Sequence, residues 1–261
     1  MSRWLVTELP GWVLLLGLIL LIAGGAVLIQ TYVRRRYPAL TRDEHNEATK
    51  FTYGFIGFVY AFFIGFMVSS MWGQISTADT NARSEGAAAV QMATDSAIFA
   101  DVDADRIRQS LLSYAQASVA EWSHTDQARS READDALAGV YRAYEQVRPE
   151  TDTQKTFLAT SLSNLDKVSQ ARTVRLLTAQ SDTGPPWPLW AVIFLTSAMV
   201  LGTVIIYGVE KSVVHYPMVA VVGVIVAANL FLVLELSHPY VGEIATSSDP
   251  LQEVASVLSH D

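Results

Sequence analysis

The sequence predicts an all-α integral membrane protein with four transmembrane helices and a soluble antiparallel helical bundle inserted between the second and third spans. Of the 261 residues, 51% are hydrophobic and 17% are charged, a composition typical of membrane proteins rather than soluble ones. Four long apolar stretches are present, and residues 74–186 between the second and third are rich in Ala, Ser, Asp, Glu, Arg and Gln.

The first predicted span runs from Pro10 to Val33 and ends at three consecutive arginines, Arg34 to Arg36. Basic residues beside a span are retained on the cytoplasmic side of the membrane. We therefore expect the N-terminus outside the cytoplasm and residues 34–50 in a basic cytoplasmic loop. Residues 1–73 form the first membrane domain, with spans one and two.

The second predicted span, Phe51 to Trp72, contains no ionisable side chain and is long enough to cross a hydrocarbon layer about 30 Å thick. Small side chains recur every four residues and form one ridge, at Gly57, Ala61, Gly65 and Ser69. A neighbouring ridge carries Phe58, Phe62 and Phe66. The small ridge predicts close helix packing, within or between subunits.

Residues 74–186 form the predicted soluble insertion. Apolar side chains recur at helical spacing around Leu111, Val140 and Leu165, and an alanine-rich segment from Gln74 is able to extend the second span as one long helix. Four amphipathic helices of this kind favour an antiparallel bundle.

The sequence GPPWPLW at residues 184–190 ends the bundle and begins the third span, and the fourth span runs from Met218 to Leu236. Residues 187–261 therefore hold spans three and four and a short C-terminal tail. Tryptophans lie at the membrane face opposite the arginines and form half of an aromatic belt: Trp4, Trp12, Trp72, Trp187 and Trp190. We expect a multi-pass protein of a bacterial inner membrane, with both termini and the insertion outside the cytoplasm.

The composition also excludes several function classes. The formal net charge of -8 argues against nucleic acid as a partner, and the absence of cysteine excludes disulfides and thiolate metal sites. No nucleophile with a base, phosphate-binding loop or zinc-binding motif occurs at an informative spacing. We therefore expect no enzymatic activity and no cofactor.

Several short motifs follow one another in a characteristic order: His45-Asn46, the GF-rich second span, EGAA at Glu85, Tyr114, Glu121-Trp122, an arginine-rich helix, PPWPLW and LSHPYVG. In this order they resemble the bestrophin-like membrane family of unknown function, over nearly the whole chain. One motif departs from the family, because LSHPY at residues 236–240 stands where Leu-Asp-x-Pro-Phe is usual. Glu235 and Glu243 are the candidate replacements for the family's acidic residue.

Bestrophins are pentameric ion channels whose narrow neck is ringed by apolar residues of the second span. The resemblance therefore implies a homo-oligomeric channel, a pentamer, with Phe58, Phe62 and Phe66 at the pore. It also implies a cytoplasmic helical domain, whereas the arginine triplet places the insertion outside. We follow the charge rule, since juxtamembrane arginines act directly on insertion.

Each candidate pore residue also has a simpler interpretation. The phenylalanine ridge is either a hydrophobic gate that conducts when wetted or ordinary packing between spans. Glu235, an acid near the end of the fourth span, marks an ion or proton pathway, or else it contacts headgroups or His238. Asn229 either hydrogen-bonds a neighbouring helix or lines a pore.

Two further clusters lie outside the spans. His45 and Glu47 form either a cytoplasmic cation or proton site at a pore mouth or a solvated helix start. Asp101, Asp103 and Asp105 alternate like the opening of a calcium loop, yet Arg106 and Leu112 stand where that loop needs glycine and glutamate. Acids at a helix N-terminus explain the same triplet, and loose calcium binding is the alternative.

The function that these observations favour is a homo-oligomeric ion channel in contact with membrane lipid, with the second span lining the path of inorganic ions. The insertion carries more acidic than basic residues, which weakly favours cations. The alternative is a non-conducting membrane scaffold or sensor whose extracytoplasmic bundle binds a partner.

Overall fold

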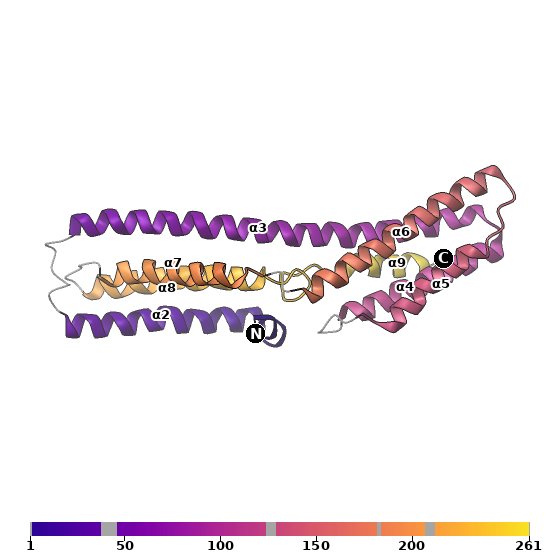
Figure 1. Ribbon diagram of the computed structural model, residues 1–261. Helices are drawn as coiled ribbons and strands as arrows, with labels where there is room; N and C mark the ends of the chain where they lie inside the picture. The colour runs from indigo at the N-terminus through magenta and orange to yellow at the C-terminus, as the bar shows by residue number, and fades with distance from the viewer. Residues whose placement is uncertain (1, 38–45, 124–128, 182–183, 207–211, 261) are drawn as a thin grey trace. The chain divides into compact units, whose positions relative to one another are not determined.

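The computed structural model describes residues 2–37, 46–123, 129–181, 184–206 and 212–260 (Figure 1). Helices and loops account for all of these residues, and no strand occurs among them. The helices are α1 (Ser2–Glu8), α2 (Gly11–Arg36), α3 (Asn46–Asp95), the 3-10 turn η3 (Ser96–Ile98), α4 (Asp101–Ser123), α5 (Arg131–Glu145), α6 (Asp152–Gln180), α7 (Trp187–Ile206), α8 (Ser212–Glu235) and α9 (Asp249–His260).

Within the described part of the chain, four segments are long and apolar enough to cross a membrane: Gly11–Arg36, Phe51–Ile98, Trp187–Ile206 and Val213–Glu235. Each of them overlaps one of the four predicted spans. The predicted all-α class with four transmembrane helices is therefore confirmed. The second of these segments is continuous with the polar residues beyond it, because α3 is one helix of 50 residues.

The chain divides into two compact units. Unit 1 comprises residues 1–73, 184–238 and 242–244, and unit 2 comprises residues 74–183, 239–241 and 245–261. Residues 245–261 therefore belong to unit 2, whereas the sequence suggests a short C-terminal tail after the fourth span.

Unit 1 is held together by close packing of apolar helices. α2 lies directly against α8, where a Cβ at Gly223 would be 2.6 Å from the Ala23 Cα, so two small residues allow the backbones to meet. Ala26 of α2 joins a buried cluster with Val204, Ile205 and Val219 of α7 and α8. Figure 1 shows α7 and α8 between α2 and the membrane part of α3.

Unit 2 has an apolar core from α3, α4, α5, α6 and α9. Its fully buried side chains include Met92, Leu111, Val140, Leu165 and Val254. α9 also packs closely on α3, since a Cβ at Gly86 would lie 2.7 Å from the Pro250 carbonyl oxygen. The glycine of the EGAA motif thus makes room for the C-terminal helix.

α6 begins at a capping box. The Thr151 hydroxyl accepts from the Gln154 N–H at 3.1 Å, and the Gln154 side-chain oxygen accepts from the Thr151 N–H at 3.3 Å. Two backbone donors that a helix start leaves free are satisfied in this way. The cap fixes the register of α6, which carries the two buried arginines of unit 2.

Candidate functional site

The membrane part of α3 has two faces of different character. Tyr60, Ile64 and Met67 are buried, and the Tyr60 hydroxyl lies 3.4 Å from the Ser197 hydroxyl of α7. On the opposite face, Phe58, Phe62 and Phe66 are between 66% and 71% exposed. One side of α3 therefore packs on its own protomer, and the predicted phenylalanine ridge points away from it.

The exposed ridge is longer than the three predicted phenylalanines. Phe51 and Phe55, at 79% and 61% exposed, also lie on it. At 3.6 residues per turn, the five phenylalanines occupy one sector roughly 80° wide. The spacing of these phenylalanines, four or three residues apart, places them on one face of the helix. Only the packing of α3 shows that no other described helix of the protomer covers this face.

The predicted small-residue seam has no partner within the described part of the protomer. Gly57 and Gly65 have no atom of another element within 4 Å of an added Cβ, and Ala61 and Ser69 are exposed. The close small-residue packing inside unit 1 uses Gly223 and Ala23 instead. A seam at the predicted positions would join different copies of the chain, and it stays a prediction.

Glu235 ends α8 as a buried carboxylate, 2% exposed, and its Oε2 accepts no hydrogen bond from the residues described. Gly242, with φ 109°, folds the following loop back over it, and a Cβ there would lie 2.8 Å from the same oxygen. Any other residue at position 242 would be strained by this backbone conformation, and its Cβ would force the Val6 and Glu235 side chains to move. The ion-pathway role of Glu235 stays a prediction.

Glu243, the other candidate acid of this loop, has a structural role. Its Oε1 accepts from the Gly11 N–H at 2.9 Å, which caps the first turn of α2. A carboxylate at this position also complements the positive end of the helix dipole.

Asn229 is half-buried in α8, and no hydrogen bond to its amide occurs among the described residues. An amide in hydrocarbon is costly when it stays unsatisfied. A neighbouring copy or pore water would satisfy it, as the two sequence-based alternatives propose.

The remaining candidate sites do not come together as a binding site. His45 lies outside the described residues, and so does the side chain of Glu47. Asp103 accepts from Arg106 Nη1 at 2.7 Å in the first turns of α4, which Asp101 begins, and Asp105 is exposed. In the described part of the chain, no three His, Asp or Glu side chains are close enough to hold a metal ion. Calcium binding by these aspartates stays a prediction.

His215 forms a buried polar contact inside unit 1. Its Nε2 lies 3.0 Å from the Val204 carbonyl oxygen, so this nitrogen carries the proton. Nδ1 then accepts from Gln30 Nε2 at 2.8 Å and from Arg34 Nη1 at 3.0 Å. The imidazole of His215 thereby links α2, α7 and α8 in a region where interhelical hydrogen bonds help to hold the helices together.

Unit 2 contains an ionic network that the sequence analysis does not predict. Arg172 donates from Nη2 to Glu121 Oε1 at 2.7 Å and from Nε to Oε2 at 3.0 Å, and its Nη1 reaches Asp134 at 2.7 Å. Arg175 lies 3.2 Å from Glu121 and 3.4 Å from Glu85. The two arginines and two glutamates are at most 2% exposed.

Aromatic residues complete this network. The Tyr114 hydroxyl donates to Glu85 Oε1 at 2.7 Å, and burial together with the Glu85 carboxylate raises the pKa of Tyr114 well above its ordinary value. The Arg175 guanidinium lies 4.6 Å from the Trp122 ring centroid, and Trp122 meets Tyr240 edge to face at 5.7 Å.

The network is internally compensated. Burial alone would raise the pKa of Glu121, but hydrogen bonds from Arg172 and the Ser130 N–H, with both arginine charges, lower it overall. The neighbouring Arg129 and then Arg172 hold the pKa of Asp134 below its ordinary value. Because each charge has an opposite partner, the network ties helices together and offers no free charge to a ligand. Most of its residues stand in the family motifs, namely Glu85, Tyr114, Glu121, Trp122 and the two arginines of the arginine-rich helix. That shared membership is the sequence signal that could have found the network.

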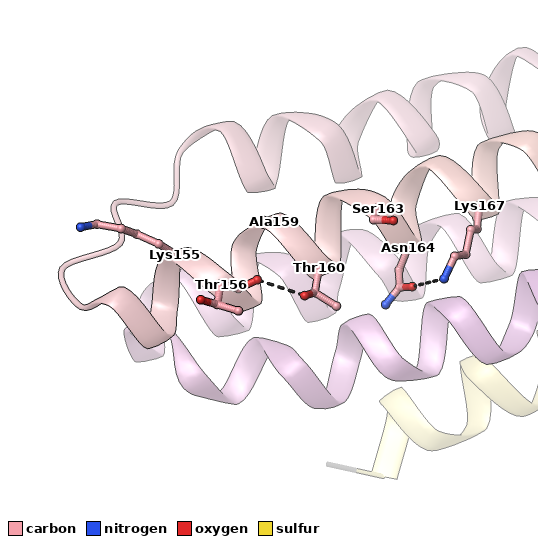
Figure 2. A pocket seen from close by; sticks show the side chains of 7 residues that line it. All are labelled: Lys155, Thr156, Ala159, Thr160, Ser163, Asn164 and Lys167. Carbon is pink, nitrogen blue, oxygen red and sulfur yellow. Dashed lines mark hydrogen bonds between the residues drawn. The ribbon is translucent and has the colours of Figure 1, made fainter.

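A shallow hollow of about 590 Å³ lies along the outer face of α6 (Figure 2). The Thr160 hydroxyl donates to the Thr156 carbonyl at 3.0 Å, and Lys167 donates to the Asn164 side chain at 3.1 Å. These polar groups are satisfied by their own helix, so the hollow is a solvated helix surface rather than a binding site.

The family is decided by the match of the Bestrophin-like domain, which covers residues 20–251. The chain belongs to the bestrophin-like family. No curated protein matches the sequence. This bestrophin-like chain is therefore an all-helical, multi-pass membrane protein, as the resemblance of its motifs predicts.

Solved structures share its fold at low sequence identity. A mutant of a bacterial bestrophin homologue from Klebsiella pneumoniae is 18% identical, with a TM-score of 0.64 and 95% of each chain covered. Another mutant of the Klebsiella homologue is 17% identical, with a TM-score of 0.67, 94% of this chain and 98% of that chain covered. A further crystal structure, of a mutant membrane protein, is 15% identical, with a TM-score of 0.69. The match covers 94% of this chain and 96% of that chain.

Proposed function

We propose that this bestrophin-like protein is a homo-oligomeric ion channel of a bacterial inner membrane, with α3 lining the pore. The observation that carries the proposal is the row of exposed phenylalanines opposite the buried face of α3. A helix packed on its own protomer by one face has the other free for a pore or for a second copy. Membership of the family supports the same assignment.

Phe58, Phe62 and Phe66 act as a hydrophobic constriction in this proposal. Their rings close the path to ions until it is wetted. The adjacent row of Gly57, Ala61 and Gly65 receives the neighbouring copy of α3, because small side chains allow the backbones of two helices to approach. Together the two ridges build a ring of α3 helices, with a pentamer as the family-based subunit number.

The excess of acidic residues in the segment 74–186 supports a weak preference for cations, since its field attracts them and repels anions. In this proposal the segment lies outside the cytoplasm together with both termini, and the arginine triplet at the end of α2 supports this orientation.

The direct test is ion flux through the full-length protein reconstituted in liposomes, under sodium, potassium and chloride gradients. Phe62→Ala should raise flux by widening the constriction. Phe63→Ala is the matched control, because Phe63 lies on the same helix about 100° away from Phe62. If the oligomer is intact and neither the wild type nor Phe62→Ala conducts, the scaffold or sensor alternative replaces the channel.

Orientation needs a separate measurement. Ser163 is exposed on the outer face of α6 (Figure 2), and the chain contains no cysteine. Ser163→Cys should react with a membrane-impermeant thiol reagent added to spheroplasts. Protection of this cysteine until the membrane is opened would place the segment 74–186 in the cytoplasm.

A further inference from the structure

Unit 1 contains an apolar groove that the proposed pore does not use. Its volume is about 290 Å³, and it is lined by Leu5, Leu18, Trp190, Phe194, Leu230 and Leu234. These residues come from α1, α2, α7 and α8, and no polar side chain lines the groove. We propose that this groove binds one acyl chain of a membrane phospholipid.

The walls of the groove are packed against neighbouring side chains. Leu230 and Leu234 of α8 are buried, and the rings of Trp190 and Phe194 stack with centroids 5.6 Å apart. α1 contributes Leu5, while the next residue, Val6, is buried. The groove is therefore a formed depression with side chains from four helices, and not a gap between two of them.

The depth of the groove matches one leaflet of a bilayer. Leu18 and Phe194 each lie seven residues after the first residue of their helix, which is about 10 Å along the axis at 1.5 Å per residue. Half of the hydrocarbon core is about 15 Å thick. The groove thus extends from the start of α2 and α7 into the leaflet on that side.

Tryptophans mark the headgroup level at the same end. Trp4, Trp12 and Trp187 are between 63% and 77% exposed and lie in α1 and in the first turns of α2 and α7. Indole rings favour the boundary between headgroups and hydrocarbon. A phospholipid whose headgroup lies at this level has its acyl chain at the depth of the groove.

Lipid is favoured over a second copy of the chain by the position of α2. Figure 1 shows α7 and α8 between α2 and the membrane part of α3 in unit 1. If α3 surrounds the pore, α2 lies on the outer, lipid-facing side. This last step rests on the proposed function; the lining, depth and tryptophan level do not.

The test uses full-length protein in phospholipid vesicles that include a phosphatidylethanolamine with a photoreactive diazirine on one acyl chain. Labelled peptides are mapped by mass spectrometry. We expect labelling concentrated at the starts of α2 and α7. Leu18→Trp fills the groove and should reduce that labelling about tenfold, which corresponds to about 1.4 kcal/mol of lost binding free energy. Leu20→Trp is the control, since Leu20 is on the same helix, 75% exposed and outside the groove.

A second pair of variants covers the case in which Leu18→Trp fails to fold. Phe194→Ala removes an exposed wall of the groove and should also reduce the labelling, whereas Leu195→Ala, the adjacent exposed residue outside it, should not. If the groove residues are labelled no more strongly than Leu20 and Leu21, the lipid at the groove is ordinary surrounding lipid and the proposal is overturned. Oxidative dimers of a Phe194→Cys variant would show instead that a second copy covers the groove.

Flux is measured in the same vesicles. If neither the wild type nor Phe62→Ala conducts but the labelling is specific, the channel is refuted and the lipid site stands. A conducting protein with uniform labelling refutes the lipid site and leaves the channel.

Discussion

Arg172 and Glu121 face each other through two hydrogen bonds, 2.7 and 3.0 Å long, and both side chains are buried. The pair joins α6 to α4, and Asp134 and Arg175 extend it to α5 and α3. Buried ion pairs add little net stability when formed, but the loss of one partner leaves a charge without compensation in a medium of low dielectric constant.

Glu121→Gln should therefore lower the free energy of unfolding by about 3–5 kcal/mol. The measurement is thermal unfolding of the detergent-solubilised protein, followed by intrinsic fluorescence, where we expect a fall of roughly 10 °C in Tm. Asp79→Asn is the control, because Asp79 pairs with Arg83 at the surface and such pairs contribute little. Equal shifts for both variants would contradict the importance of the buried network.

The same network predicts acid sensitivity. The pKa values of Glu121 and Asp134 are lower in the folded chain than their ordinary values near 4. Groups with a lowered folded pKa contribute their full stability above the unfolded pKa and lose it as the pH falls through the folded pKa. We expect Tm to be independent of these groups at neutral pH and to fall below about pH 4. Asp134→Asn should reduce the fall in Tm below about pH 4. An unchanged fall in Tm would show that other carboxylates cause it.

Gly86→Ala should disturb the docking of α9. The added methyl group would lie 2.7 Å from the Pro250 carbonyl oxygen, and overpacking of this kind costs about 1–3 kcal/mol. Limited proteolysis should then release the C-terminal helix faster than in the wild type. Gly139→Ala in α5 meets no neighbouring atom within 4 Å and should stabilise its helix by about 0.5–1 kcal/mol. Release of the C-terminal helix at the wild-type rate in both variants would show that α9 accommodates the added methyl group at position 86.

Gly223→Ala should separate α2 from α8. A Cβ at this position would be 2.6 Å from the Ala23 Cα, a backbone atom that cannot move without its helix. We expect a lower Tm and loss of protein during purification. Gly202→Ala in α7 has open space around the new methyl group and is the matched control. If Gly223→Ala behaves like Gly202→Ala, the contact between α2 and α8 is looser than the structure indicates.

Much of the fold could be predicted from local patterns. The stretches without charge, such as Phe51 to Trp72, predict spans because the hydrocarbon layer accepts few ionised side chains. The candidate site was predictable in part. The spacing of Phe58, Phe62 and Phe66 places them on one face, but no pattern within a helix tells which face its neighbours cover. The C-terminal α9 was missed, since its docking depends on a distant glycine at position 86.

The sequence by itself determined the number of spans, the break at GPPWPLW and the presence of two ridges on α3, because these depend on the hydropathy and spacing of residues close together in the chain. The tertiary structure decided that Tyr60 rather than Phe62 packs on α7, that Glu85, Glu121, Arg172 and Arg175 share one buried network, and that Gly242 folds back over Glu235. Residues up to 137 positions apart, such as Tyr60 and Ser197, meet at these sites. Their contacts depend on how whole helices pack, and local periodicity does not contain that information.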